Sequence, residues 1–427
     1  MSCYSTSPGQ HCIKMNNKVL IIGLVWPEPD ATAAGTRMLQ LIRFFQGQDY
    51  ELTFASAAAR SPLSYDLSTL SVISVPIKLN DSGFDTMISD LEPGIVVFDR
   101  FITEEQFGWR VREICPTAFC ILDSEDLHFL RKGREKALGQ EQNKLEAFMK
   151  NEDAKREIAS IYRADLTLVI SEFETELLKE TFKIDPSLLL YLPFLIDSQS
   201  KEETSVLPNF KERKHFITMG NFKHRPNRVA VLFLQKEIWP LIRSALPDTE
   251  MNIYGAYITE ELQQMNNSKE GFLVKGWAAD KKEVYMNSRV CLAPLRFGAG
   301  LKGKLIDAMQ FGTPCITTRT GAEGMQGDLP WNGFVEDDVK RIAEKAVRLY
   351  QDEATWNRSR NNGFALLKHN FDRQSFEKAL KDRIDHLRLN LTKHRENNFI
   401  GSLLSHHTMQ STKYLSKWIE AKNVNAQ

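Results

Sequence analysis

The sequence lacks a hydrophobic run long enough to cross a membrane. The longest apolar run, Val19 to Trp26, has the length of one strand, whereas a spanning helix needs about 18–20 apolar residues. The first 17 residues are polar and show neither the basic start nor the apolar core of a secretory signal. We therefore expect a cytoplasmic protein in which residues 1–17 form a flexible N-terminal extension.

Cysteine is scarce, and its spacing indicates no cross-link or metal site. The chain has six cysteines, with no C-x-x-C pair and no histidine near them at metal-ligand spacing. Cys291 and Cys315 lie in apolar, strand-like runs, where a thiol packs as a small core residue. This usage is typical of a reducing compartment, and we predict no metal ligands.

The sequence has no net charge, because 55 Lys and Arg balance 55 Asp and Glu. This balance does not favour a nucleic-acid partner. It conceals an asymmetry: residues 1–200 contain 20 basic and 29 acidic residues, whereas residues 201–427 contain 35 and 26. An acidic half and a basic half suit a two-part molecule with an anionic ligand on the second part. Chance placement on solvated faces is the alternative.

Strand-like and helix-like stretches alternate along most of the chain, as in parallel sheets with crossover helices. The first run of expected strands lies at about 18–25, 52–55, 72–75, 95–99, 118–122 and 166–170. The pattern lapses around 188–197. It restarts with expected strands at 216–219, 251–254, 273–274, 290–295 and 315–318. The sequence thus predicts an α/β protein of two facing Rossmann-like domains, 18–198 and 199–377.

The remaining segment, 378–427, is basic and has a helical pattern. An apolar face continues from Phe376 to Leu391 and then through 399–404 and 414–419. We expect this helical tail to brace the N-terminal domain. An amphipathic contact with a membrane or a partner is the alternative.

The most informative stretch follows the expected strand that ends at Leu295. Three glycines form a short loop, and a helix begins near Lys304. A helix N-terminus binds phosphate through its free N–H groups and the positive end of its dipole. We expect a phosphate site in which the loop backbone takes part, and a tight loop with solvated lysines is the alternative. The residues expected at this site are Arg296, Gly298, Gly300, Lys302, Lys304 and, for a ribose, Asp307.

This stretch resembles the donor-binding signature of retaining GT-B glycosyltransferases, a group typified by bacterial mannosyl- and glucosyltransferases. The likeness continues through 311–318 and through Gly321 to Met325. Earlier segments match the pattern in the same order, at 165–174, 192–197, 220–227 and 274–277. The resemblance covers about residues 18–380. It implies a GT-B architecture, a nucleotide-diphosphate sugar as donor, and donor contacts by Gly321 and Glu323.

The sequence departs from the family pattern at two positions. The family places one Glu eight residues before a second; here Asp307 stands second and Ala299 lies eight residues earlier. The first acid is therefore missing, and the loop from Gly298 to Lys304 resembles a variant with glycines and lysine. This variant implies a different contact with the donor sugar. Phe194 replaces an asparagine at the turn between the domains.

The loop after the first strand corresponds to the family's glycine-rich loop. Its small residues permit close approach to a sugar, and Gly35 and Arg37 at a helix start are placed to meet phosphate or acceptor. An ordinary strand-to-helix loop is the alternative.

A second group of polar residues follows the expected strand at 118–122. Asp123, Asp126 and His128 come directly after it, and Asp99 ends the preceding strand. Open α/β sheets bind ligands at this edge, so we expect a cleft there with His128 contacting the donor sugar or an acceptor hydroxyl. Capping of a helix by the acids, with His128 merely packed, is the alternative.

The loop from Gly220 to Arg225 carries Lys223, His224 and Arg225 ahead of a helix that opens at Pro226. Three potential cations there would clamp a diphosphate from the side opposite to the lysines. A solvated basic turn is the alternative.

The resemblance implies a retaining hexosyl- or related glycosyltransferase that needs no cofactor or metal. Its catalytic residues would be His128, Arg225, Lys302 and Lys304. Its partners would be a nucleotide-sugar donor and a glycan or lipid-linked acceptor, as in bacterial surface polysaccharide assembly, with peripheral contact at the inner membrane face. Two alternatives stay open: a catalytically silent nucleotide-sugar-binding relative that assists another transferase, or an epimerase of the same fold.

Overall fold

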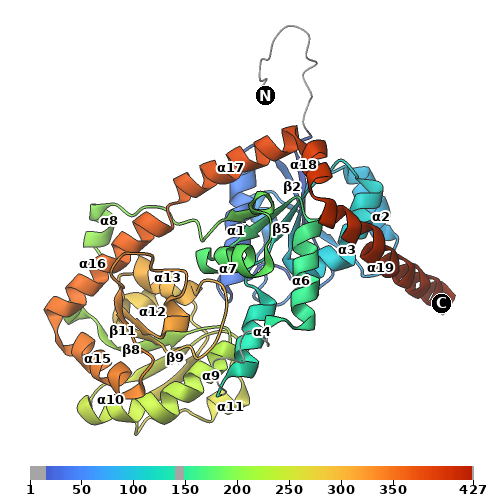
Figure 1. Cartoon of the computed structure of the whole chain (residues 1–427). Helices are drawn as coiled ribbons and strands as arrows, with labels where there is room; N and C mark the ends of the chain where they lie inside the picture. Colours follow the sequence, from blue (N-terminus) through green and yellow to red (C-terminus); the bar gives the residue numbers. More distant parts are fainter. Residues whose placement is uncertain (1–15, 140–148, 426–427) are drawn as a thin grey trace.

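Two parallel sheets form two lobes, which Figure 1 shows side by side. The computed structural model describes residues 16–139 and 149–425, so residues 1–15 of the expected N-terminal extension lie outside the described residues. Helices cover both sheets, and further helices follow at the C-terminus. The predicted α/β class with two Rossmann-like domains and a helical tail is confirmed.

The first domain is built on a sheet in which the described residues supply seven strands, in the order β3-β2-β1-β4-β5-β6-β7. The strands are β1 (Lys18–Gly23), β2 (Glu51–Ser56), β3 (Ile73–Pro76), β4 (Ile95–Asp99), β5 (Phe119–Asp123), β6 (Leu166–Val169) and β7 (Leu189–Tyr191). The helices are α1 (Ala33–Gln46), α2 (Gly83–Leu91), α3 (Arg100–Ile114), α4 (His128–Ala137), α6 (Glu152–Arg163) and α7 (Glu172–Phe182). The central strands are continuous apolar runs because helices bury both of their faces.

The second domain repeats this plan with a sheet of six described strands, ordered β10-β9-β8-β11-β12-β13. The strands are β8 (Lys214–Met219), β9 (Met251–Tyr254), β10 (Phe272–Gly276), β11 (Ser288–Ala293), β12 (Cys315–Thr317) and β13 (Gly333–Val335). The α-helices are α8 (Lys201–Ser205), α9 (Arg225–Phe233), α10 (Trp239–Ala245), α11 (Glu260–Gln263), α12 (Lys281–Asn287), α13 (Gly303–Gln310), α14 (Arg319–Ala322), α15 (Val339–Gln351) and α16 (Glu353–Asn370).

The sequence pattern missed two strands, β7 and β13. Each lies at the edge of its sheet and has three residues. A run of three residues is too short to show a strand periodicity. In particular, the lapse expected around 188–197 contains the last strand of the first domain.

The C-terminal helices return to the first domain. Helix α17 (Arg373–Leu389) places Leu380, Ile384 and Leu387 in the hydrophobic core beneath that sheet. Helices α18 (Leu391–Asn397) and α19 (Phe399–Asn425) follow, and α19 packs on α3 and α6 before it extends away from the lobe (Figure 1). Within the described ranges, no helix combines the length and the apolar character that crossing a bilayer requires.

Candidate functional site

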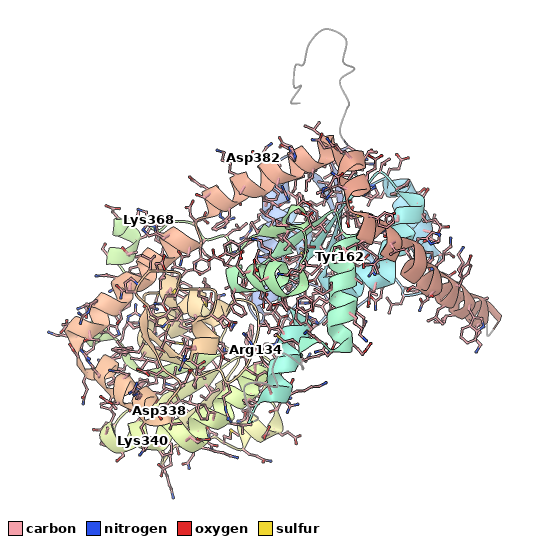
Figure 2. The ribbon with its side chains drawn as sticks, viewed as in Figure 1. Arg134, Tyr162, Asp338, Lys340, Lys368 and Asp382 are labelled. Atoms are coloured by element: carbon pink, nitrogen blue, oxygen red, sulfur yellow. The ribbon has the colours of Figure 1, made fainter. Side chains whose placement is uncertain are left out.

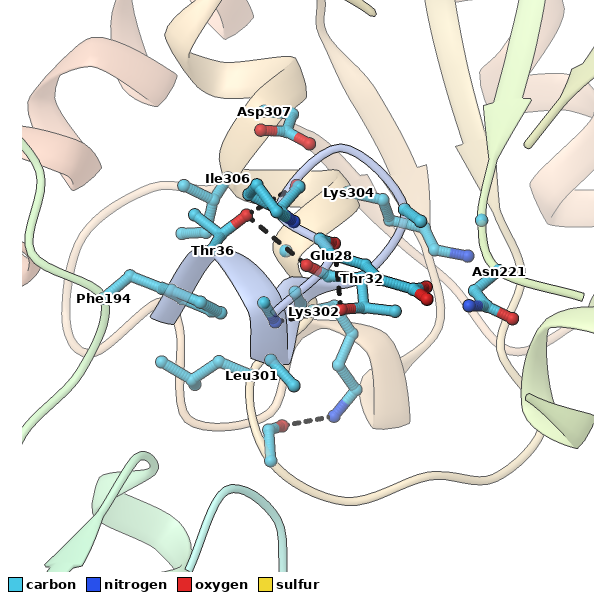
Figure 3. A pocket seen from close by; sticks show the side chains of 18 of the residues that line it. Glu28, Thr32, Thr36, Phe194, Asn221, Leu301, Lys302, Lys304, Ile306 and Asp307 are labelled. Carbon is cyan, nitrogen blue, oxygen red and sulfur yellow. Dashed lines mark hydrogen bonds between the residues drawn. The ribbon is translucent and has the colours of Figure 1, made fainter. Parts of the chain in front are cut away.

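A cavity of about 1030 Å³ lies between the two domains, where the central strands of both sheets end. The loop after β1, the start of α1 and the ends of β4 and β5 form its first-domain wall. Segments 219–227 and 295–307 form much of its second-domain wall. Glu28 and Thr32 of the first wall line the cavity together with Lys304 of the second, and Figure 3 shows the Lys302 side chain directed away from them to the carbonyl that it contacts.

The N-terminus of α13 opens into this cavity. Lys302 precedes the first helical residue, and its Nζ donates to the Gly300 carbonyl at 2.7 Å. The Nζ of Lys304, in the first turn, donates to Asn227 Oδ1 at 2.7 Å. Two lysines and the positive end of a helix dipole together make this wall a site for an anion.

Burial changes the ionisation of the groups on this wall. It lowers the pKa of Lys302 to about 8 and that of Lys304 also to about 8, because the charged ammonium loses water. Burial raises the pKa of Asp307, one turn further along α13. The Asp307 carboxylate accepts from Lys281 Nζ at 3.0 Å, which opposes that rise.

The glycine loop before α13 touches the first domain directly. Gly300 has φ +62°, and a Cβ on it would lie 2.9 Å from the Cβ of Asp126, so only glycine fits. Its N–H donates to Glu174 Oε1 at 2.5 Å, and the Gly298 carbonyl accepts from Arg134 at 2.8 Å. The expectation that the loop backbone offers its N–H groups to phosphate is therefore wrong for Gly300, which instead joins the two domains.

The first-domain wall carries buried polar groups around His128. Burial lowers the pKa of His128 to about 4, so its imidazole is neutral near pH 7. Burial alone would raise the pKa of Asp126, but Arg131, at 3.0 Å, and His128 outweigh this and bring it to about 2. The His128 ring also packs edge-on against Phe101. His128 can thus exchange hydrogen bonds with a ligand but does not act as a cation.

Two polar bridges hold the domains together at the rim of the cavity. Arg134 of α4 forms a bidentate pair with Glu323 at 2.7 and 2.8 Å, and Figure 2 places Arg134 at the junction of the lobes. On another side, the Tyr257 hydroxyl contacts both carboxylate oxygens of Glu28 at 2.9 and 3.0 Å. The structure therefore has its domains closed on the cavity.

Residues 213–352 match the family model described as glycosyl transferases group 1. This segment lies in the second domain, which we call the group 1 domain after that model. None of the curated proteins matches the chain in sequence. The resemblance predicted from the motif at 293–325 is confirmed for this domain.

Solved structures of glycosyltransferases share the fold over most of this chain, including both domains. Sucrose-phosphate synthase from Thermosynechococcus elongatus matches with a TM-score of 0.62 at 14% identity, covering 87% of this chain and 99% of that one. HepE from Anabaena in complex with UDP-glucose matches with a TM-score of 0.61 at 13% identity, covering 87% of this chain and 100% of that one. The lipopolysaccharide outer core galactosyltransferase WaaB matches with a TM-score of 0.56 at 14% identity, covering 86% of this chain and 99% of that one. These likenesses show the GT-B fold.

The cavity brings together ten of the residues expected at the site. They are Gly35, Asp99, Asp126 and His128 of the first domain, and Gly220, Gly298, Gly300, Lys302, Lys304 and Asp307 of the group 1 domain. Among the residues that the structure describes, those placed outside the cavity lining are Arg37, Asp123, Arg225, Arg296, Gly321 and Glu323.

The expected cationic clamp at 223–225 does not form. Arg225 turns to Glu135, with its Nη1 at 2.6 Å from the carboxylate, at the outer surface. His224 is exposed, and its Nε2 lies 3.2 Å from Arg131 Nη1 of the first domain, which can only donate, so this nitrogen accepts and the ring is not a cation in this contact. Lys223 lines the cavity but lies over the Tyr257 ring, 3.5 Å from its centre. No local pattern in the sequence indicates that Glu135 and Tyr257, on other elements, engage Arg225 and Lys223.

Other expected ligand contacts have structural partners instead. Arg37 and Asp123 form a buried ion pair at 2.7 Å beneath the cavity. Arg296 is exposed and lies over the Phe233 ring, 5.0 Å from its centre. Glu323 pairs with Arg134, as above. Gly321 is packed against Thr317, where a Cβ would clash with the threonine side chain.

Sequence reasoning missed several residues of the cavity. Lys281 adds a third lysine beside Asp307, and Asn227 positions Lys304. Glu28 reaches across to Tyr257 of the second domain. The family-like segments contained Asn227 and the loop contained Glu28, but no spacing rule distinguishes these side chains from solvated neighbours.

Proposed function

We propose that the protein is a retaining glycosyltransferase that moves a sugar from a nucleotide-diphosphate donor to a glycan or lipid-linked acceptor. The observation that carries this proposal is the pair Lys302 and Lys304 at the N-terminus of α13. Both lysines line the cavity between the domains, and both belong to the segment that matches the group 1 family model. The structure of HepE, which shares the fold, contains UDP-glucose.

The lysine wall suits the charge that develops during transfer. As the bond between the sugar C1 and the phosphate oxygen breaks, the leaving diphosphate gains negative charge, and Lys302, Lys304 and the α13 dipole stabilise it. In a front-face reaction the acceptor oxygen bonds to C1, and its proton passes to the leaving phosphate oxygen. This route needs no separate catalytic base. Closure of the domains excludes water and so limits donor hydrolysis.

The remaining cavity residues orient the substrates. Asp307 is placed to accept hydrogen bonds from a ribose, with Lys281 as its partner. His128, neutral at pH 7, is placed to exchange a hydrogen bond with a sugar hydroxyl. Retention of configuration rests on the resemblance to the retaining family, and the anomeric signal of the product by NMR tests it.

We further propose that transfer needs no metal ion, because lysines occupy the phosphate-facing wall. In the described part of the chain, no three His, Cys, Asp or Glu side chains group as metal ligands. The test is thermal unfolding with a panel of nucleoside diphosphates and their sugars, in EDTA. A ligand at 100 times its Kd adds about 2.7 kcal/mol, and we expect a clear rise in Tm with one base. No shift with any of them contradicts the donor site and favours the silent-relative alternative, and a shift that needs Mg²⁺ contradicts metal independence.

We also propose that α19 contacts the inner membrane face. Its buried side carries Ser416 and Glu420 against Arg110, whereas its apolar exposed residues lie on the other side at helical spacing. These are Phe399, Ile400, Leu403, Tyr414, Leu415 and Trp418. We expect sedimentation with vesicles that contain phosphatidylglycerol and loss of binding in the double variant Tyr414→Ser/Trp418→Ser. Equal sedimentation of both proteins contradicts this contact.

A further inference from the structure

Two carboxylates stand side by side at the ends of neighbouring strands, but they differ in their partners. Asp99 ends β4, Asp123 ends β5, and the two are register partners in the sheet. Asp123 Oδ1 and Oδ2 accept from Arg37 Nε at 2.9 and 3.2 Å. Asp99 is 4% exposed; its Oδ2 accepts from the Leu24 N–H at 3.0 Å, whereas its Oδ1 is buried and finds no hydrogen-bond partner among the described residues.

Glu125, two residues beyond β5, shows the same feature. It is 7% exposed, it lines the cavity, and its Oε1 is buried without a hydrogen-bond partner in the described ranges. Its backbone is left-handed, with φ +60°, and that of Arg100 beside Asp99 is left-handed as well, with φ +70°. Non-glycine residues adopt this conformation at a cost, and such residues cluster at functional sites. Two of them flank this corner of the cavity.

Each charged carboxylate at this corner has a cationic partner, whereas Glu125 has none among the described residues. Asp123 pairs with Arg37, Asp126 with Arg131, and Asp99 with Arg100 at 3.3 Å. Burial and the neighbouring Asp123 raise the pKa of Glu125 to about 8, so its carboxyl group is largely protonated near pH 7. Buried polar oxygens in proteins are almost always hydrogen-bonded, so two orphaned carboxyl oxygens on one cavity wall indicate that a bound ligand supplies the donors.

We propose that Asp99 and Glu125 form a subsite that binds the hydroxyl groups of an uncharged sugar unit of the acceptor. This assignment rests on the proposed function, in which the nucleotide diphosphate occupies the lysine wall on the other domain. The carboxyl wall is then left to the second substrate. Sugar hydroxyls donate hydrogen bonds to the orphaned Asp99 and Glu125 oxygens. A carboxylate or phosphate on the same sugar unit has no hydrogen to donate to these oxygens, and it meets the negative charge of Asp99.

The test measures sugar binding to the full chain saturated with UDP. NMR titration compares glucose with glucuronate, galactose with galacturonate, and N-acetylglucosamine with its 6-phosphate. We expect at least one neutral sugar to bind, and its anionic counterpart to bind at least about tenfold more weakly. Equal or tighter binding of the anionic sugars, or no binding of any neutral sugar while UDP binds, overturns the subsite. If UDP does not bind, the titration is repeated with the nucleoside diphosphate that raises the Tm in the panel; absence of binding by every nucleoside diphosphate of the panel overturns the proposed function instead.

Conservative variants then assign the effect to these residues. Glu125→Gln and Asp99→Asn should each weaken neutral-sugar binding by about tenfold, while the Kd for UDP stays within about twofold of wild type. The matched control Glu105→Gln, a first-domain glutamate paired with Arg156 outside the cavity, should leave sugar binding unchanged. We expect Glu125→Gln to unfold at or above the wild-type Tm, because it removes a buried carboxyl group that lacks a partner. Normal sugar binding in both variants overturns the proposal.

Discussion

Replacement of Lys304 by alanine is expected to lower the affinity for the nucleoside diphosphate identified in the panel by about tenfold or more and to lower kcat for transfer by about 100- to 1,000-fold. The ammonium is held at the mouth of α13 by Asn227, so it meets the diphosphate without further ordering. The larger effect falls on kcat because the leaving diphosphate carries more charge in the transition state than in the bound donor. Calorimetric titration and initial rates separate the two effects.

Arg225 supplies a matched control for this substitution. It is a cation on the same domain, close to the same loop, but its guanidinium pairs with Glu135 away from the cavity. Arg225→Ala should therefore bind the nucleotide with wild-type affinity. If Lys304→Ala binds the nucleotide as well as wild type does, or if Arg225→Ala loses as much affinity, the phosphate site is placed wrongly.

The pH dependence of nucleotide binding gives the same site an independent readout. Burial lowers the pKa of Lys302 and of Lys304 to about 8. In the protein without nucleotide, both ammonium groups therefore lose their protons as the pH rises through 8. An anion binds the protonated form, and its affinity should consequently fall above pH 8. In Lys304→Arg the fall should be shallower, because a guanidinium stays charged throughout this range. An affinity that is constant from pH 7 to 9.5 contradicts a binding role for these lysines.

The sequence predicted the parts of this molecule that depend on neighbours along the chain. Apolar runs marked the central strands, and the loop before Lys304 followed by a helical face marked the start of α13. These features are local. A strand that is buried on both faces is a short run of apolar residues, and a helix N-terminus follows a short glycine-rich loop, so each is visible within a few residues of sequence.

Pairings between distant segments were not predictable in this way. Arg37 meets Asp123 because two elements 86 residues apart converge beneath the cavity. Glu323 and Arg134 lie 189 residues apart on different domains. A charged residue in a loop has the same local pattern whether it faces a ligand, a buried counter-ion or water. Five of the six expected site residues outside the cavity are charged, and their misplacement follows from this ambiguity.

Replacement of Arg37 by alanine is expected to destabilise the first domain by about 3–5 kcal/mol, since it leaves the Asp123 carboxylate buried without its counter-ion. The Arg37 side chain is 1% exposed and that of Asp123 is 0% exposed. Arg37 also donates to the carbonyls of Leu192 and Pro193, at 2.6 and 3.3 Å. Urea unfolding monitored in the first domain measures the loss as a shift of its midpoint.

A double variant distinguishes a structural pair from a ligand contact. In Arg37→Met with Asp123→Leu, apolar side chains replace both charges, and most of the lost stability should return, because no unpaired charge remains in the core. The nucleotide affinity of the folded double variant should match that of wild type. If Arg37→Ala unfolds like wild type but no longer binds substrate, then Arg37 is a ligand contact, as its position after the first strand had indicated.

The same contacts give Arg37 an expected influence on domain closure. Leu192 and Pro193 begin the segment that leads out of the first domain, and Gln40, one turn after Arg37 on α1, exchanges hydrogen bonds with Leu195 at 2.9 and 3.0 Å. Helix α1 thus anchors the start of the segment that leads from the first domain to the second, while the first turn of α1 lines the cavity. Any movement of the second domain about this segment has to act against the Arg37 and Gln40 contacts. A loss of Arg37 should therefore loosen the relation between the two domains at temperatures where each still holds its own core.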